Sequence, residues 1–183
     1  GSGTIAIEAA QIACRIPAGM IRRFAFEKLL PFQVHVWSAI KNEAEGAITT
    51  SAVPIFGSDV AHRMVDFAQR NAERAGVADA VQLRGGDALQ RVPPCEQPGV
   101  MLLNPPYGER IGEQDELATF YPQLGTALKR HWAGWNCFFF TADLRLPKLV
   151  GLKPSRKTPL FNGPLECRLF RFDMVKGSAR GKP

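Results

Sequence analysis

The stretch Leu103-Asn104-Pro105-Pro106-Tyr107-Gly108 contains the residues of this sequence that are best suited to chemistry. The apolar run over 100–103 predicts a short buried strand, which ends at an asparagine followed by two prolines. Each proline fixes its own φ and disfavours a helical residue before it, so the chain leaves the strand as a stiff arm. This Asn-Pro arm could simply end the strand. It could also hold an amine, with the Asn104 side-chain oxygen and the Pro105 carbonyl as fixed acceptors and the Tyr107 ring as a stacking surface.

Three more signals lie where strands are expected to end. Strands predicted over 53–59 and 80–84 lead to Asp59 and Asp87, and the glycine-rich turn Gly1-Ser2-Gly3-Thr4 runs into a helix that should begin at its last residue. Such a turn lets backbone approach a ligand, and a helix N-terminus favours negative groups. Ligands of open α/β sheets bind beyond the carboxyl ends of the strands, so we expect one site here. A helix N-cap is the alternative role for each acid.

The framework for these residues is predicted from the hydrophobic pattern. Near-continuous apolar strands alternate with amphipathic helices, which is typical of an α/β fold with a mostly parallel sheet covered on both faces. Further strands are expected over 99–103, 135–141, 155–161 and 165–174, and helices over 60–75, 114–131 and 143–150. Pro122 should kink or restart the longest helix. The last two strands should form an antiparallel hairpin with its turn at Asn162-Gly163.

The expected domain organisation is one catalytic domain over 1–175 and a basic, disordered tail over 176–183. A glycine-rich turn normally follows a strand, so we expect that a first strand upstream of Gly1 is missing; a cloning scar is the alternative. A basic insertion interrupts the domain at about 15–52, with a helix around 32–46. Its basic residues alternate with aromatic ones, a pattern that could form a nucleic-acid surface. We favour a lid whose aromatic side chains pack on the core.

Composition narrows the class of protein. With 45% hydrophobic and 22% charged residues, the chain of 183 residues is predicted to be globular. It has no apolar stretch long enough for a bilayer and no export signal, so we expect a cytoplasmic protein without a membrane partner. Four scattered cysteines and three scattered histidines predict reduced thiols and no metal site. The net charge of +6 suits a polyanionic partner such as nucleic acid.

A nicotinamide dehydrogenase is the first alternative, because Gly1-x-Gly3-x-x-Ala6 fits the dinucleotide fingerprint. That fold places its ribose-binding acid roughly 20 residues after the glycines. Here Asp59 follows Gly3 by 56 residues. The dinucleotide interpretation also leaves the Asn-Pro arm without a role, so we rank it lower.

The sequence resembles the class I S-adenosylmethionine-dependent methyltransferases that carry an Asn-Pro-Pro-Tyr motif. Within them it is similar to the 23S ribosomal RNA guanine-N2 methyltransferases with an upstream THUMP domain. The likeness extends over nearly the whole chain and includes Asn104–Arg110 and Asn162–Cys167. Gly1-Ser2-Gly3-Thr4 is similar to the end of the family's first motif, Asp-Pro-x-Cys-Gly-Ser-Gly-Thr. The first half of that motif and its strand are absent, as is a THUMP domain.

The resemblance implies a Rossmann-like methyltransferase sheet, mostly parallel, with a C-terminal antiparallel hairpin and a missing first strand. It implies S-adenosylmethionine as the cofactor: Gly1, Gly3 and Thr4 would line its methionine part and Asp59 would bind the ribose hydroxyls. Asp87, with Ala88 nearby, would bind the adenine amine. Asn104 would lie next to the cofactor and act in catalysis with Pro105, while Tyr107 would stack on an extruded base.

The function implied by the resemblance is methyl transfer to an exocyclic base amine, with guanine N2 of 23S ribosomal RNA as the first choice. Adenine N6 in DNA is the nearest alternative, because the four-residue motif serves both amines. A non-catalytic RNA-binding fragment is the third. The partners that we expect are ribosomal RNA and, in the parent chain, a THUMP domain.

Overall fold

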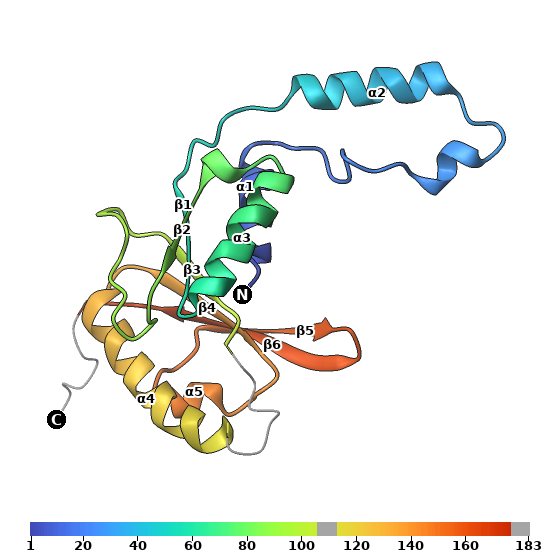
Figure 1. Cartoon of the computed structure of the whole chain (residues 1–183). Coiled ribbons are helices and arrows are strands. Elements are labelled where there is room, and N and C mark those ends of the chain that lie inside the picture. The colour runs from blue at the N-terminus through green and yellow to red at the C-terminus, as the bar shows by residue number, and fades with distance from the viewer. Residues whose placement is uncertain (106–112, 177–183) are drawn as a thin grey trace. The chain divides into compact units, whose positions relative to one another are not determined.

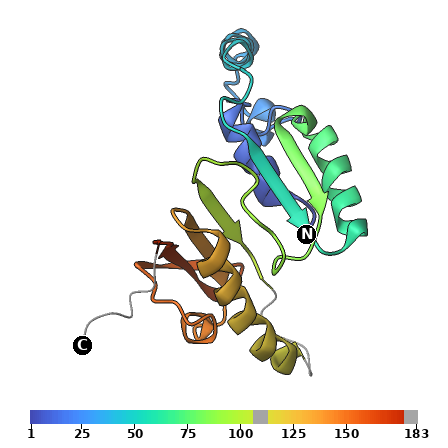
Figure 2. The same ribbon diagram turned by 90° about the vertical axis from the view of Figure 1, so that its left-hand side faces the viewer.

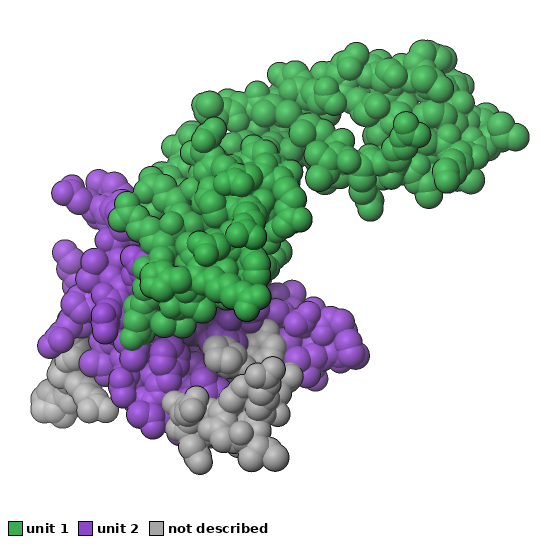
Figure 3. Space-filling model, viewed as in Figure 1, with its two compact units in different colours: residues 1–87 green, residues 88–183 purple. Residues whose placement is uncertain are grey.

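The structure is a computed structural model that describes residues 1–105 and 113–176, apart from the side chains of 113–116. The predicted tail therefore lies almost entirely outside the described residues. The chain divides into two compact units, Gly1–Asp87 and Ala88–Pro183, which Figure 3 shows in green and purple. Each unit is described by itself.

Unit 1 is built on two parallel strands with two helices packed against them (Figures 1 and 2). The strands are β1 (Ile55–Asp59) and β2 (Val81–Gly85), and the helices are α1 (Thr4–Ala13) and α3 (His62–Arg74). A short 3-10 turn, η2 (Ala78–Ala80), precedes β2. The core side chains are Ile7, Ala10, Ala72, Val77 and Val81. Ala10 on α1 and Ala72 on α3 are completely buried, and their small side chains allow both helices to pack closely.

The insertion between α1 and β1 contains the 3-10 turn η1 (Ala25–Lys28) and the helix α2 (Val34–Gly46), as Figure 1 shows. The helix expected around 32–46 is thus confirmed. The expectation that the aromatic side chains of the insertion pack on the core is wrong. Phe24, Phe26, Phe32 and Trp37 instead pack on one another. No residue of η1 or α2 is buried.

Unit 2 contains a four-stranded sheet in the order β3-β4-β6-β5. The strands are β3 (Val100–Leu103), β4 (Asn136–Thr141), β5 (Arg156–Asn162) and β6 (Leu165–Asp173), and the helices are α4 (Glu113–His131) and α5 (Leu146–Leu149). β3 and β4 are parallel, whereas β6 is antiparallel to both of its neighbours. The predicted α/β fold with a C-terminal antiparallel hairpin is therefore confirmed.

One face of the unit 2 sheet is covered by α4 and α5 (Figure 2). Phe139, Phe170 and Phe172 on that face are no more than 2% exposed. Within unit 2, α4 and α5 both pack on this face, whereas on the opposite face Val100 is 66% and Leu102 is 42% exposed.

Two local predictions need adjustment. The structure keeps α4 as one helix across Pro122. In the hairpin, Asn162 pairs with Leu165, so the turn residues are Gly163 and Pro164, one position later than expected. Gly163 has φ 59°, a conformation in which glycine avoids the strain of a Cβ atom.

Candidate functional site

The glycine-rich turn at the start of unit 1 is held against α3. Gly3 has φ 86°, and a Cβ at this position would lie 2.8 Å from the Cβ of Ala68. The carbonyl of Ser2 accepts a hydrogen bond of 2.8 Å from Asn71 Nδ2. A side chain at position 3 would therefore clash with α3 and strain the backbone, so this position requires glycine.

The N-terminus of α1 offers backbone donors at this turn. Gly3 is the N-cap residue, so it has no side chain that could bond to the first N–H groups of the helix. The hydroxyl oxygens of Ser2 and Thr4 lie 3.2 Å apart beside them. Free N–H groups and the helix dipole together favour a negatively charged group, such as a carboxylate.

Asp59 ends β1 beside the same turn, where its carboxylate contacts the Gly1 ammonium group and accepts a hydrogen bond of 2.9 Å from Ala61 N–H. Burial works to raise the pKa of Asp59, but the hydrogen bonds from Gly1 and Ala61 and the ammonium charge outweigh it and hold this pKa below its usual value. The alternative role as a helix N-cap is wrong. The N-cap of α3 is Ala61, two residues later, without a side-chain cap.

Asp87 follows the end of the neighbouring strand and is half-buried. Asp59 and Gly85 are opposite each other in the parallel register, and Gly86 N–H donates to the Asp59 carbonyl at 2.9 Å. The chain after Asp87 forms a turn and no helix begins there, so the N-cap role is wrong for this residue as well. Unit 1 thus brings together the turn and both strand-end acids.

Two residues beside these acids, Val60 and His62, were not predicted from the sequence as part of the site. Val60, directly after Asp59, is 72% exposed and offers an apolar surface at the strand ends. The His62 imidazole lies over Gly85, where a Cβ would be 2.6 Å from its Cε1 atom. An apolar residue after a strand-ending acid was the available signal for Val60. We see no sequence signal for His62.

The Asn-Pro arm begins at the carboxyl end of β3 in unit 2. Asn104 is exposed, whereas Pro105 is buried and anchors the start of the arm. Leu103 is opposite Phe139 in the register with β4, so Asn104 continues toward the end of that strand. Ala88 packs against the core of unit 2. Pro106, Tyr107 and the rest of the motif to Arg110 lie outside the described residues.

The end of β4 contains an acid–base pair that was also missed. Asp143 is bound by Arg145 through two side-chain hydrogen bonds of 3.0 and 2.9 Å and through its N–H at 2.9 Å. The hydrogen bond from the guanidinium holds the pKa of Asp143 below its usual value, against the opposing effect of burial. The Asp143 N–H in turn donates to the hydroxyl of the fully buried Thr141. The sequence signal that could have identified Asp143 is its position, two residues after the end of the apolar strand β4.

In the described part of the chain, no group of three or more His, Cys, Asp or Glu residues could hold a metal ion. All four cysteines are free, and burial raises the pKa of Cys137 to about 12. In the same part of the chain, no helix has both the length and the apolar character needed to cross a membrane.

Comparison with known proteins places this geometry in context. Residues 1–171 match the sequence profile of a family described as RMKL-like, methyltransferase domain. The ribosomal RNA large subunit methyltransferase K/L of Shewanella loihica is 40% identical over 185 residues, which cover 98% of this chain and 26% of the relative. This chain thus spans about a quarter of the length of the curated relatives that it matches.

Two solved structures are similar over almost all of the chain. SMU.472, a proposed methyltransferase solved with SAH, has a TM-score of 0.87 and 30% identity, covering 97% of this chain and 47% of that chain. A protein from Listeria monocytogenes, described as a predicted N6-adenine-specific DNA methylase, has a TM-score of 0.83 and 29% identity, covering 95% of this chain and 44% of that chain.

Proposed function

The chain belongs to the family of RMKL-like methyltransferase domains, and from this premise we propose that it methylates an exocyclic base amine with S-adenosylmethionine. Guanine N2 of 23S ribosomal RNA is the proposed target. The similarity to a relative that is named as a large-subunit ribosomal RNA methyltransferase supports this target. The excess of basic over acidic residues supports a nucleic-acid substrate.

The residues of unit 1 fit this cofactor chemically. The backbone of Gly1 and Gly3 and the first residue of α1, Thr4, would hold the methionine part, whose carboxylate suits the free N–H groups of the helix. The Asp59 carboxylate, which ends β1 beside this turn, would accept hydrogen bonds from the ribose hydroxyls. Asp87 would bind the adenine amine, with Ala88 following it. When bound, S-adenosylmethionine supplies an electrophilic methyl group on its sulfonium sulfur.

Catalysis is assigned to the Asn-Pro arm. An exocyclic amine is a poor nucleophile because its lone pair is delocalised into the base. The Asn104 oxygen and the Pro105 carbonyl would accept the two amine protons, favour a pyramidal nitrogen and stabilise the positive charge that develops on it. The stiff backbone before Pro105 would keep both acceptors in place. Tyr107 is proposed to stack on the extruded base.

The observation that carries this proposal is the position of Asn104. Asn104 is exposed directly after β3, and the next residue, Pro105, is buried, so the arm is anchored at its start. The strand ends of a parallel pair are where ligands bind in open α/β sheets.

The parent protein is proposed to carry an upstream THUMP domain and to act in the cytoplasm. The upstream domain is supported by the length of the curated relatives, which is about four times that of the matched region. The cytoplasmic location follows from the proposed ribosomal substrate. The residues that precede Gly1 test the missing first strand and the cofactor: an apolar strand that ends in Asp-Pro-x-Cys would support both, whereas a THUMP sequence farther upstream would support the additional domain.

The test of the activity is tritiated methyl transfer to undermethylated ribosomal RNA and to duplex DNA, followed by nucleoside analysis. We expect N2-methylguanine in the RNA. Asn104→Ala should lower turnover by roughly 100-fold or more, while calorimetry should find the affinity for S-adenosylmethionine within about twofold of the wild type. Asn42→Ala, an exposed asparagine of α2, is the matched control and should leave turnover unchanged.

The second candidate is adenine-N6 methylation of DNA, which the description of the Listeria monocytogenes structure favours. Methyladenine in DNA as the only product would establish it and refute the first choice. A folded sample that binds no S-adenosylmethionine would instead support the third alternative, a non-catalytic RNA-binding fragment.

A further inference from the structure

The last turn of α3 contains an asparagine whose side chain is bonded to a distant part of unit 1. Asn71 is half-buried, and its Nδ2 donates a hydrogen bond of 2.8 Å to the carbonyl of Ser2, which lies 69 residues earlier in the chain. Asparagine is a poor helix former because its side chain competes with the backbone for hydrogen bonds. An asparagine at this position therefore needs a reason outside the helix itself.

The other side of the Asn71 amide is bound by Arg74. The Nη2 of Arg74 donates to Asn71 Oδ1 at 2.6 Å, and its Nε donates to the Arg70 carbonyl at 3.4 Å. Arg74 is exposed, and in the described residues no salt bridge joins its guanidinium to an acid. The amide thus has a donor on one side and an acceptor on the other, and these two partners fix its orientation with the NH2 group toward Ser2.

The hydrogen bond from Asn71 sets the direction of one backbone donor in the glycine-rich turn. The Ser2 carbonyl belongs to the peptide group that joins Ser2 to Gly3, and this group is trans. In a planar trans peptide the N–H points opposite the carbonyl. Because the Ser2 carbonyl points toward α3, the Gly3 N–H points away from α3. Gly3 is the N-cap of α1, so this N–H has no partner within that helix.

Two side chains on the same face of α3 lie against the turn. Ala68 precedes Asn71 by three residues, a spacing that makes them neighbours on the helix surface. A Cβ at Gly3 would lie 2.8 Å from the Cβ of Ala68. The small side chain of Ala68 therefore allows the turn to approach α3, and the amide of Asn71 orients it. An alanine at position 71 would keep the approach and lose the orientation.

We propose that Asn71 is a positioning residue for the cofactor. Its amide, held by Arg74, orients the peptide between Ser2 and Gly3 so that the Gly3 N–H is available to the methionine carboxylate of S-adenosylmethionine. This inference rests on the proposed cofactor role of the turn and adds the residues that prepare it. Asn71 acts through the turn, so its effect is on cofactor affinity and not on the methyl-transfer step.

Calorimetry of the whole chain with two ligands tests this role. S-adenosylhomocysteine contains the carboxylate of the methionine part, whereas methylthioadenosine contains the adenosine part without that carboxylate. Asn71→Asp keeps the size of the side chain and an acceptor for Arg74, but an ionised carboxylate cannot donate to the Ser2 carbonyl. We expect this variant to raise the Kd of S-adenosylhomocysteine by roughly 10-fold and to leave the Kd of methylthioadenosine within about twofold of the wild-type value.

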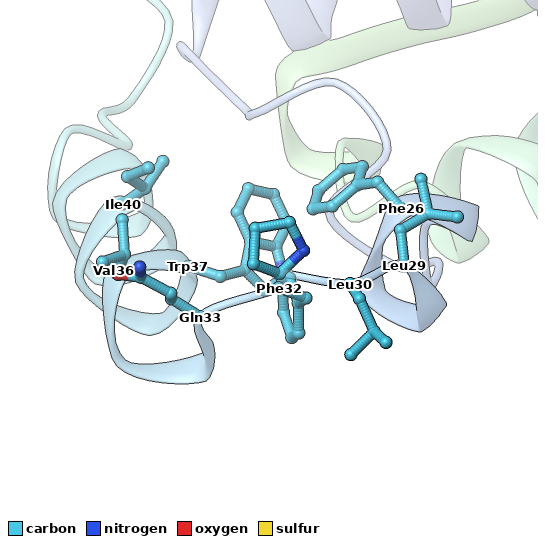
Figure 4. Close-up of a pocket in the computed structure, with 9 residues that line it drawn as sticks. Phe26, Leu29, Leu30, Phe32, Gln33, Val36, Trp37 and Ile40 are labelled. Atoms are coloured by element: carbon cyan, nitrogen blue, oxygen red, sulfur yellow. The ribbon is translucent and has the colours of Figure 1, made fainter.

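The two ligands separate positioning from a purely structural role. If the Asn71 hydrogen bond only stabilised unit 1, Asn71→Asp would weaken both ligands equally or neither, and either result would overturn the inference. Asn71→Ala should repeat the selective loss, and retained binding of methylthioadenosine shows that a variant is folded. Gln33→Ala is the matched control, because Gln33 is exposed, lines an apolar groove of the insertion (Figure 4) and makes no side-chain cap hydrogen bond with α2. It should leave both Kd values unchanged.

The contribution of Arg74 has its own test. Arg74→Met removes the donor to Asn71 and should raise the Kd of S-adenosylhomocysteine about threefold. In a protein that already carries Asn71→Ala, the same change should have little effect, because Arg74 acts through Asn71. Equal effects in both backgrounds would overturn the role of Arg74. A wild type that binds neither ligand would refute the proposed cofactor function itself, whereas wild-type binding without a selective loss in the Asn71 variants would refute this inference alone.

Discussion

The buried Gly125 in α4 offers a test in which the structure and helix propensity predict opposite signs. In an unconstrained helix interior, replacing glycine with alanine stabilises the folded state by about 1 kcal/mol. In this fold a Cβ at Gly125 would overlap the carbonyl oxygen of Val150 and lie 2.8 Å from its carbonyl carbon. Val150 is the C-cap of α5, and its N–H bonds to the Leu146 carbonyl.

The expected magnitude follows from what would have to move. Overpacking a core costs about 1–3 kcal/mol, and the upper end applies here because the obstacle is backbone rather than a side chain that can rotate. Subtracting about 1 kcal/mol for helix propensity leaves a destabilisation of about 2 kcal/mol for Gly125→Ala.

The assay is urea unfolding followed by tryptophan fluorescence, because Trp132 and Trp135 both lie in the core of unit 2. Gly46→Ala is the control: it makes the same substitution at the last residue of α2, where a Cβ would meet nothing within 4 Å. It should be neutral or slightly stabilising. A Gly125→Ala protein as stable as the wild type would refute the packing of α4 on α5.

Three further outcomes are expected. Asp59→Ala should weaken S-adenosylmethionine binding by roughly 10-fold or more, measured by calorimetry, because a carboxylate that accepts hydrogen bonds is lost; an unchanged Kd would remove the ribose role. The wild type should be more stable than Asp143→Asn at neutral pH, and urea unfolding should find this advantage lost as the pH falls through the lowered pKa of Asp143, since a carboxylate with a lowered folded-state pKa stabilises only while ionised. The ordinary pKa of an aspartate is 3.8, and in the folded protein that of Asp143 is lower. If the wild type is still more stable than Asp143→Asn at a pH low enough to protonate Asp143 completely, the ion pair with Arg145 is contradicted. A thiol reagent should modify the half-buried Cys95 of the native protein much faster than the buried Cys137, and a Cys95→Ser protein without a fast phase would confirm the assignment.

Much of the fold follows from local sequence signals. The strand that ends at Asp59 and the helix after it were predicted to within two residues, and the start of α1 was predicted correctly, because apolar runs and glycines mark these elements directly. The hairpin was placed one residue too early because Asn162-Gly163 is a good turn pair by itself. The register that pairs Asn162 with Leu165 depends on the whole length of β5 and β6.

The failures concern packing at a distance. An alternation of rings and cations does not reveal whether the rings meet the core or one another, so the prediction for Phe24 and Trp37 was wrong. The close approach of the His62 ring to Gly85 also depends on how α3 crosses β2. By contrast, the placement of Asp59 and Asp87 at neighbouring strand ends could be predicted, because strand ends can be read from the sequence and parallel pairing brings them to one edge.

The placement of the cysteines gives each unit a native reporter of its own opening. Cys14 is buried in unit 1, and Cys137 is completely buried in unit 2, so neither thiol can react until the structure around it opens. Under native conditions, the labelling rate of each thiol therefore measures the population of a locally unfolded state. Equal opening free energies at both thiols would mean that the chain opens as one cooperative body. Unequal values would rank the two units and identify the one that opens first.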